Sequence, residues 1–394
     1  MRYVIDNREI KNICIVGAGN EGHYLMAEIG QDRDLSISVL TSNSDNFGEY
    51  VESHNVQTGK VTKGWISRVS TNPSDVIPDA DMIIFTVPSN ACEKYLNAIY
   101  PHVMDGVILG FLPGTGGVEF LTRSFIEDKG CRIFGTQRVP SGTKVLERGH
   151  SVNALEKRKD IRVASIPSRI NHDVCNFISH SIDIKTIALP NWLSVTFTPS
   201  NPILHTSRLY GLFHDYVDGM SWKEHLSFYK NWDELSSEML IGCGDELKQC
   251  FDKLNHYNLN GIALPREHYE ICTVEGKDDV EKMTNKIRSL IYLKDYAPMC
   301  KQDDGTFIPD FKSRYFVEDF PFGLAVLRAF CKACEVEAPH MDKVLLWYDK
   351  IYNAGFYVDG KFEGEGLKNI PIPQNYGIKT IKDIEQYYDR IENL

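Results

Sequence analysis

The chain has 394 residues, 42% of them hydrophobic, and a formal net charge of −11. Its length exceeds what one hydrophobic core normally serves, which predicts two domains, and its acidic charge argues against nucleic acid or an anionic membrane as the main partner. No run approaches eighteen consecutive apolar residues, and the charged N-terminus lacks an apolar signal core. We therefore expect a cytoplasmic protein that acts on small molecules, with neither a nucleic acid nor a membrane as partner.

The first half of the chain alternates short apolar strands with helical segments. The expected strands are residues 12–16, 36–40, 66–69, 81–87, 107–112, 132–134, 162–164 and 185–189, and the expected helices between them include residues 21–29 and 93–100. Strands that alternate with helices predict a parallel, doubly wound α/β sheet of the Rossmann type.

The pattern changes near residue 190, where long helical stretches replace the strands. These helices are expected at about residues 202–216, 224–254, 280–290, 321–334 and 341–354. We therefore expect a dinucleotide-binding domain over residues 1–190 and a mostly α-helical domain over residues 191–394. The ten cysteines are scattered, and the single CxxC pair, Cys331 and Cys334, lies in an apolar helical run. Helix packing is the preferred interpretation of that pair, and no metal site is expected.

A glycine-rich turn follows the first of these strands. Gly17-Ala18-Gly19-Asn20-Glu21-Gly22 is a G-x-G-x-x-G sequence that opens the helix at 21–29. Gly17 permits the tight turn, Gly19 lets the backbone approach a pyrophosphate, and Gly22 allows the helix to pack closely on the strand. In this setting the six residues predict a dinucleotide site, with the phosphates at the helix N-terminus.

The end of the second strand leaves the choice of cofactor open. NAD-binding units usually place a carboxylate there for the ribose 2′-hydroxyl, whereas this chain has Thr41-Ser42-Asn43-Ser44. Neither a carboxylate nor an arginine occurs in this stretch. Thr41 and Ser42 remain candidate cofactor contacts, and the cofactor is NAD or NADP.

Two further loops end strands of the same predicted sheet. Val87-Pro88 follows the strand at 81–87, and Gly114-Thr115 follows the strand at 107–112. Ligands of open α/β sheets bind outside these strand ends. We expect all four residues to contact the cofactor, although tight turns alone would use similar residues.

Two segments of the second half carry candidate catalytic residues. His205 follows Ser200, Asn201 and Pro202, which are suited to begin a helix, and a histidine near a helix N-terminus is suited to proton exchange. Asp319 precedes an apolar helix as a natural N-cap, and Arg314 offers a two-pronged contact for a substrate carboxylate. By spacing alone, a packed or solvated histidine is the better explanation of His205, and a capping aspartate and a surface arginine explain Asp319 and Arg314 at least as well.

Sequence blocks along nearly the whole chain resemble the octopine/nopaline dehydrogenase family, also called opine dehydrogenases. The most specific block has the form PDF-x-x-RY-x-x-ED-x-P-x-G and runs from Pro309 to Gly323. The other matching segments are Gly17–Gly22, Thr86–Pro88, Pro113–Gly117, Leu226–Leu240, Asp342–Trp347 and Pro373–Gly377.

The resemblance implies an oxidoreductase that reduces the imine formed between an amino acid and a 2-oxo acid such as pyruvate. It assigns the nicotinamide cofactor to the first domain and the two substrates to the helical domain. The family's catalytic trio maps onto His205 as general acid/base, Asp319 as its orienting partner and Arg314 as a carboxylate anchor. The resemblance leaves the amino acid and the oligomeric state open, and a homodimer is compatible with it.

Two departures from the family pattern bear on substrate identity. His205 is followed by Thr206 where many members have proline, and Gln137 lies near the position of a family glutamate. In the family, the loop with that glutamate lies near the nicotinamide. Gln137 is therefore a further candidate contact. One rival is a ketopantoate-reductase-like or glycerol-3-phosphate-dehydrogenase-like enzyme that needs no amine and uses a lysine for proton transfer. Another rival is a dinucleotide-binding sensor without catalysis.

Overall fold

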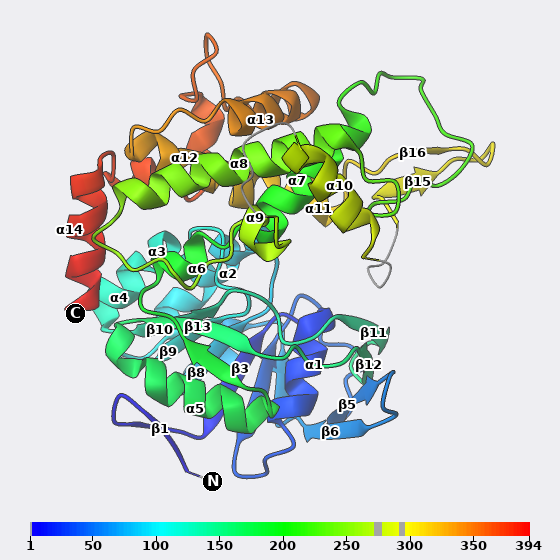
Figure 1. Ribbon diagram of the computed structural model, residues 1–394. Helices are drawn as coiled ribbons and strands as arrows, with labels where there is room; N and C mark the ends of the chain where they lie inside the picture. Colours follow the sequence, from blue (N-terminus) through cyan, green and yellow to red (C-terminus); the bar gives the residue numbers. More distant parts are fainter. Residues whose placement is uncertain (1, 272–277, 291–295) are drawn as a thin grey trace. The chain divides into compact units, whose positions relative to one another are not determined.

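The computed structural model of the chain describes residues 2–271, 278–290 and 296–394 (Figure 1). The chain divides into two compact units. Unit 1 comprises Met1–Thr196 together with Gln386–Leu394, and unit 2 comprises Phe197–Glu385. The sequence placed a boundary near Pro190. The structure divides the chain between Thr196 and Phe197, and it joins the C-terminal residues to the first unit.

Unit 1 is built on an eight-stranded sheet with the order β14-β13-β10-β9-β8-β3-β4-β7. Its strands are β3 (Asn12–Val16), β4 (Ser36–Leu40), β7 (Arg68–Ser70), β8 (Met82–Phe85), β9 (Ile108–Phe111), β10 (Arg132–Thr136), β13 (Ile161–Ile166) and β14 (Thr186–Ala188). From β7 to β10 all neighbours are parallel. This is the doubly wound dinucleotide-binding order, in which the strand order reverses between β3 and β8.

One pairing departs from the expected parallel sheet, because β13 runs antiparallel to β10. A parallel pair needs a crossover connection that brings the chain back to the same end of the sheet. The residues between β10 and β13 instead form a hairpin of two strands, β11 (Thr143–Glu147) and β12 (Ser151–Ala154). The expectation of a wholly parallel sheet was wrong at this point.

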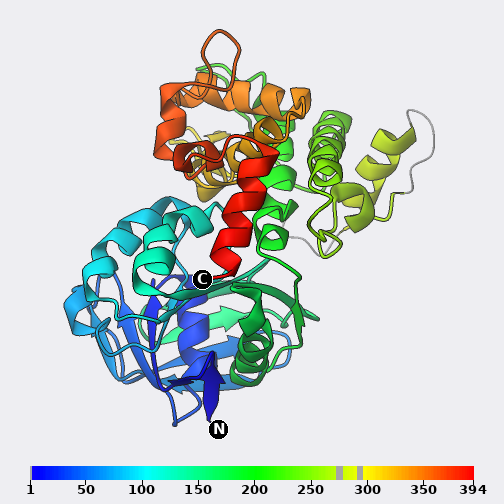
Figure 2. The same ribbon diagram turned by 90° about the vertical axis from the view of Figure 1, so that its left-hand side faces the viewer.

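Helices cover both faces of the sheet (Figure 2). On one face lie α1 (Asn20–Ile29) and α5 (Asn171–Ile182), and on the other lie α2 (Ser89–Ile99) and α4 (Arg123–Lys129). Ile13 to Val16 of β3 are consequently all buried, as expected for a central strand covered on both sides.

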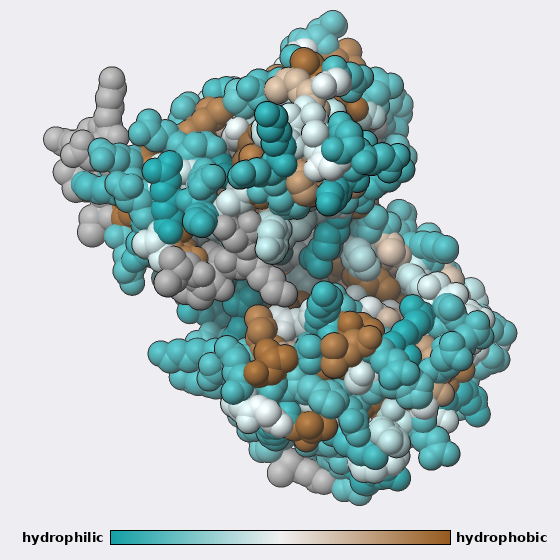
Figure 3. Space-filling model, turned by 90° about the vertical axis from the view of Figure 1, so that its right-hand side faces the viewer, coloured by the Kyte–Doolittle hydropathy of each residue, from teal (hydrophilic) through white to brown (hydrophobic). Residues whose placement is uncertain are grey.

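A second, four-stranded sheet of order β11-β12-β5-β6 packs beside α1. It combines the β11–β12 hairpin with β5 (Tyr50–Asn55) and β6 (Val61–Trp65). Gly64 permits the close approach, since a Cβ there would lie 2.0 Å from the Met26 carbonyl oxygen. Figure 3 looks from the side on which this sheet lies in Figure 1 and shows separate apolar patches on a mainly hydrophilic surface. A small hairpin of β1 (Tyr3–Ile5) and β2 (Arg8–Ile10) completes the strands of unit 1.

The C-terminal residues are tied to unit 1 through Glu119, which belongs to α3 (Val118–Leu121). The Tyr388 hydroxyl donates to Glu119 Oε1 at 2.8 Å, and the Tyr387 hydroxyl donates to the Glu119 carbonyl oxygen at 2.9 Å. Thr196, at the end of α6 (Leu193–Thr196), donates to the same carboxylate at 2.6 Å. Burial raises the pKa of Glu119, and these hydroxyls offset part of that effect.

Unit 2 is mainly helical. Its elements are α7 (Ser200–Phe213), α8 (Glu234–Lys253), α9 (Pro265–His268), α10 (Asp278–Arg288), β15 (Met299–Lys301), β16 (Phe307–Pro309), α11 (Arg314–Val317), the π-helix η4 (Phe320–Leu324), α12 (Ala325–Ala333) and α13 (Pro339–Tyr352). The last helix, α14 (Ile381–Glu392), begins in unit 2 and ends in unit 1. Among the described residues, no helix combines the length and apolar character that crossing a membrane requires.

The expected helix at 224–254 was wrong over its first ten residues. Helix α8 begins only at Glu234, because Asp233 is its N-cap and accepts a hydrogen bond from the Ser236 amide at 2.6 Å. The preceding residues form a loop in which Phe228 and Trp232 are buried. The apolar residues of this loop have a spacing similar to that of a helix, which explains the wrong prediction.

Candidate active site

The glycine turn connects β3 to α1 at the point where the strand order reverses. Gly17 has a φ of +107°, a conformation that side chains disfavour. Its amide donates to the Leu40 carbonyl oxygen at 2.9 Å, and its carbonyl accepts from the Thr86 hydroxyl at 2.9 Å. A Cβ at Gly17 would also lie 2.8 Å from Val87 Cγ1, so the turn is fitted against the end of β8.

Gly22 and Gly19 have different reasons to be glycine. A Cβ at Gly22 would lie 2.0 Å from the Gly17 carbonyl oxygen, so the close packing of α1 on the turn requires glycine. A Cβ at Gly19 would meet no described atom within 4 Å. The packing of the protein therefore leaves the Gly19 position open, and no side chain caps the first turn of α1. An exposed turn with uncapped amides fits a pyrophosphate.

The other residues of the turn point in different directions. Ala18 and Asn20 are partly or fully exposed, whereas Glu21 is buried. Burial raises the pKa of the Glu21 carboxyl to about 8, and the positive charge of Arg158 acts in the opposite direction. Because the Glu21 side chain is buried, only its backbone is left for a cofactor.

The remaining candidate contacts of unit 1 follow the parallel strands of the large sheet. Thr41 and Ser42 follow β4, Val87 and Pro88 follow β8, Gly114 and Thr115 follow β9, and Gln137 follows β10. The carboxyl ends of parallel strands share one edge of a sheet, so all of these residues lie at the edge where ligands of such folds bind.

Two of these residues have a structural role that the sequence did not indicate. A Cβ at Gly114 would lie 2.8 Å from the Gly135 Cα, so the packing of two backbones requires glycine there. Gln137 Nε2 donates to the Ser194 carbonyl oxygen at 2.7 Å. That bond orients the Gln137 amide and ties the end of β10 to α6.

His205 and Asp319 meet in unit 2. His205 Nδ1 lies 2.8 Å from Asp319 Oδ2, and the two side chains are 12% and 10% exposed. The carboxylate accepts, so Nδ1 carries the proton and Nε2 is the ring nitrogen available for proton exchange. His205 lies in the second turn of α7, and Asp319 is the residue that directly precedes η4.

The local structure around this pair corrects two expectations about helix capping. Helix α7 begins at Ser200, with Pro199 at the N-cap position and no side-chain cap, so Ser200 and Asn201 do not cap it. Asp319 occupies the N-cap position of η4, yet its side chain makes no capping hydrogen bond. Its carboxylate is directed to His205 instead.

Aromatic rings pack around the His205 imidazole. Its centroid lies 4.7 Å from that of Tyr315 and 5.6 Å from that of Phe228, and both rings meet it edge to face. Burial and the nearby Asp319 carboxylate raise the pKa of the Tyr315 hydroxyl. This apolar surrounding limits water around the imidazole and strengthens its interaction with Asp319.

Arg208, which spacing did not single out, supports the wall of this site. The residue is 1% exposed. Its Nε donates to the Phe228 carbonyl oxygen at 2.6 Å, its Nη2 to the Ser227 and Asn231 carbonyl oxygens, and its Nη1 to Asp233. Arg208 therefore fastens the loop that carries Phe228 to the same helix as His205.

Arg314 is placed differently from the other two catalytic candidates. Its side chain is 68% exposed, and its Nε lies 3.4 Å from Glu318 Oε2, whose side chain is 15% exposed. The structure thus pairs Arg314 with Glu318 within one short helical segment, five positions before Asp319. The guanidinium remains accessible for an anionic ligand.

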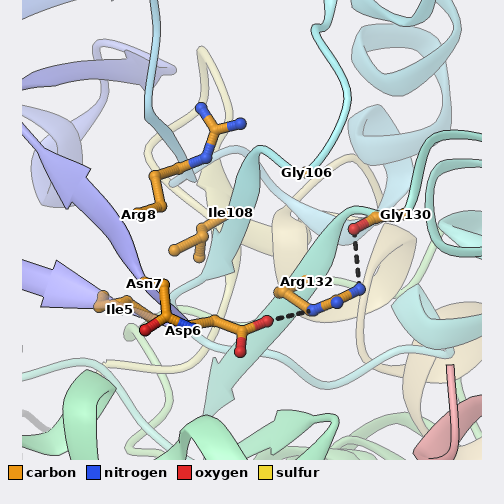
Figure 4. A pocket seen from close by; sticks show the side chains of 8 residues that line it. All are labelled: Ile5, Asp6, Asn7, Arg8, Gly106, Ile108, Gly130 and Arg132. Atoms are coloured by element: carbon orange, nitrogen blue, oxygen red, sulfur yellow. Dashed lines mark hydrogen bonds and ion pairs between the residues drawn. The ribbon is translucent and has the colours of Figure 1, made fainter.

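A cavity of about 440 Å³ lies elsewhere in unit 1 (Figure 4). It is lined by Ile5, Asp6, Asn7, Arg8, Gly106, Ile108, Gly130 and Arg132. Ile108 and Arg132 are the first residues of β9 and β10, so the cavity lies at the strand ends opposite to the glycine turn. Arg132 Nε donates to Asp6 at 2.7 Å, and Arg8 Nη2 donates to the Asp105 carbonyl oxygen at 2.6 Å. These arginines fasten the β1–β2 hairpin to the sheet.

Comparison with known proteins agrees with this arrangement. Residues 188–352 match the family model described as NAD/NADP octopine/nopaline dehydrogenase, alpha-helical domain. The tauropine dehydrogenase of Arabella iricolor is 27% identical over 94% of this chain and 99% of its own, and the opine dehydrogenase of Haliotis discus hannai is 27% identical over 94% and 97%. The chain is therefore similar to octopine, opine and tauropine dehydrogenases over most of its length. His205 and Asp319 both lie within the matched helical domain.

The fold is shared with a solved protein structure. A solved structure of octopine dehydrogenase with NADH and L-arginine superimposes with a TM-score of 0.81 at 24% identity, covering 95% of this chain and 97% of that one. This likeness confirms the expected fold class, a Rossmann-type domain followed by a mainly helical domain.

Proposed function

We propose that this protein is an opine dehydrogenase, which catalyses the NAD(P)H-dependent condensation of an amino acid with a 2-oxo acid such as pyruvate, and the reverse oxidation. The observation that carries the proposal is the buried hydrogen bond between His205 and Asp319 in the family's helical domain. It supplies an oriented acid/base, while the glycine turn of unit 1 supplies the dinucleotide site.

The residues of unit 1 fit a dinucleotide. The exposed Gly19, the uncapped first turn of α1 and the strand-end loops would hold its phosphates and sugars. When bound, the nicotinamide supplies a hydride to the reacting carbon.

His205 is the proposed general acid/base of the reaction. The amine and the 2-oxo acid lose water to form an imine, whose carbon becomes more electrophilic when its nitrogen is protonated. We propose that His205 Nε2 gives this proton, directly or through one water, and recovers it when the secondary amine is oxidised. Asp319 holds the ring in the required tautomer and stabilises the imidazolium.

Arg314 is the proposed anchor for the substrate carboxylate. Its guanidinium is exposed and has donors in the fork geometry that matches a carboxylate. Binding would replace or share its contact with Glu318. The anchor would fix the orientation of the 2-oxo acid, and this orientation supplies part of the rate enhancement.

A matrix of amino acids against 2-oxo acids tests the proposal, with oxidation of NADH and NADPH followed separately in each mixture. We expect oxidation only where both an amine and a 2-oxo acid are present. Equal oxidation with the 2-oxo acid alone would favour the ketopantoate-reductase-like or glycerol-3-phosphate-dehydrogenase-like rival, and cofactor binding without turnover would favour a sensor. A cytoplasmic location and a homodimer remain predictions, to be tested by cell fractionation and sedimentation.

A further inference from the structure

The end of β4 is more basic in the structure than in the sequence. Arg148, from the turn between β11 and β12, donates through Nη2 to the Thr41 hydroxyl at 3.2 Å and to the Asn43 carbonyl oxygen at 2.8 Å. In a sheet of this order, the end of the second strand receives the adenosine ribose of the dinucleotide. An arginine that is remote in sequence therefore occupies the place that distinguishes NAD from NADP.

The turn that carries Arg148 is fixed to the phosphate-binding helix at two points. The Val145 amide donates to Asn20 Oδ1 at 2.9 Å, and the Gly149 amide donates to His23 Nε2 at 2.7 Å. Since Nε2 accepts, the proton of His23 is on Nδ1, which donates to the Gly19 carbonyl oxygen at 2.9 Å. His23 is fully buried, so these bonds connect the Arg148 turn to the glycine turn through a rigid side chain.

The charge of Arg148 is available to a ligand. In the part of the chain that the structure describes, both of its hydrogen bonds use Nη2 and neither partner is acidic. Its Nε and Nη1 donors remain, and its side chain is exposed. The positive charge of Arg148 also lowers the pKa of His23, after the larger effect of burial.

We propose that Arg148 recognises the 2′-phosphate of NADP(H) and that this protein prefers NADPH to NADH. The inference rests on the proposed dinucleotide function of unit 1. A guanidinium forms paired, charge-assisted hydrogen bonds with a phosphate. The exposed Ser42 hydroxyl would complete the contact, and His23 acts as a positioning residue for Arg148. The competing feature is Asp45, the acidic residue that follows most closely after β4 in the sequence. Its carboxylate would favour the ribose diol of NADH.

Titration calorimetry with NADPH, NADH, 2′,5′-ADP and 5′-AMP tests the proposal without catalysis. We expect the wild-type protein to bind NADPH at least about tenfold more tightly than NADH, and 2′,5′-ADP at least about tenfold more tightly than 5′-AMP. Arg148→Gln should weaken NADPH and 2′,5′-ADP by about ten- to one-hundredfold and change NADH by less than about twofold. Lys144→Gln removes one positive charge from the same hairpin, at an exposed position of β11, and should leave the preference unchanged.

A second variant tests the role of His23. His23→Phe keeps an aromatic ring but removes the acceptor for the Gly149 amide, so the ratio of NADPH to NADH affinity should fall toward one even if overall stability drops. Equal or tighter binding of NADH by the wild-type protein would overturn the preference, and so would an equal loss of both cofactors in Arg148→Gln. Binding of neither cofactor would overturn the dinucleotide function itself.

Discussion

His205 Nδ1 and Asp319 Oδ2 lie 2.8 Å apart although they belong to different helical segments of unit 2. The contact fixes the tautomer of the histidine and leaves Nε2 as its reactive nitrogen. The chemistry assigned to unit 2 depends on this one hydrogen bond.

Replacing His205 with alanine should lower kcat by about 10² to 10⁴, because a positioned acid/base contributes a factor of this size. Asp319→Asn should also lower kcat, since its amide can donate to Nδ1 and reverse the tautomer. Steady-state kinetics with calorimetric cofactor binding checks both. Cofactor affinity should be unchanged, and full turnover by His205→Ala would remove histidine from the mechanism.

Arg314→Lys should raise KM for the 2-oxo acid by about tenfold with a smaller effect on kcat, because a point charge replaces a two-pronged contact. Glu318→Gln is the matched variant, as it frees Arg314 from its ion pair and should lower KM or leave it unchanged. Initial rates at varied 2-oxo acid concentration measure both. A wild-type KM in Arg314→Lys would show that the anchor lies elsewhere.

Gly19→Ala and Gly22→Ala should separate cofactor binding from folding. A Cβ at Gly19 meets no described atom, so stability should change by less than about 0.5 kcal/mol, while dinucleotide affinity should fall at least about tenfold. A Cβ at Gly22 collides with the Gly17 carbonyl, so stability should also fall, by about 1–3 kcal/mol. Denaturant unfolding and calorimetry provide the two measurements. Wild-type affinity in Gly19→Ala would place the phosphates away from this turn.

Arg208→Met should reduce the free energy of unfolding by about 3 kcal/mol, because it leaves buried carbonyl groups and Asp233 without their donor. It should also lower kcat, since the loop with Phe228 loses its attachment to the helix of His205. Arg208→Lys should fall between wild type and Arg208→Met in urea unfolding. A stable, fully active Arg208→Met protein would contradict this role.

His340 and Glu246 should make the stability of unit 2 depend on pH. A hydrogen bond with the Glu246 carboxylate, 2.7 Å from His340 Nδ1, raises the pKa of His340. A raised pKa means that the folded state binds the proton more tightly, so the pair stabilises fully below about pH 6.5 and loses this effect as pH rises through the folded pKa. His340→Gln should therefore lower Tm by about 2–4 °C at pH 6 and by much less at pH 9. An equal deficit at both pH values would exclude this linkage.

The sequence predicted most of the sheet and the glycine turn, because their signals are local. Buried parallel strands are short apolar runs, and the turn needs glycines at fixed spacing. The β11–β12 hairpin gave a weaker signal: β11 is mostly exposed, and the alternation of β12 extends over only four residues. The antiparallel direction of β13 follows from that hairpin and was missed with it.

The residues that support the candidate sites were harder to predict than the candidates themselves. His23 and Arg148 are remote in sequence, and only the folded hairpin brings them together. Arg208 lies three residues after His205, where an arginine is expected on the exposed face of a helix. It is buried because a loop covers it, and the apolar spacing of that loop predicted a helix instead. His23, directly after the last glycine of G-x-G-x-x-G, is a signal of this support that the sequence does contain. Its spacing alone does not identify its hydrogen-bond partner.

The most direct test of the account follows the hydride into the product. The protein is given pyruvate, an amino acid found active in the matrix, and reduced cofactor deuterated at both C4 positions, and the products are analysed by mass spectrometry. The account predicts a secondary amine that contains the carbon skeletons of both substrates and one deuterium. A deuterated 2-hydroxy acid with the amino acid left unchanged would contradict it.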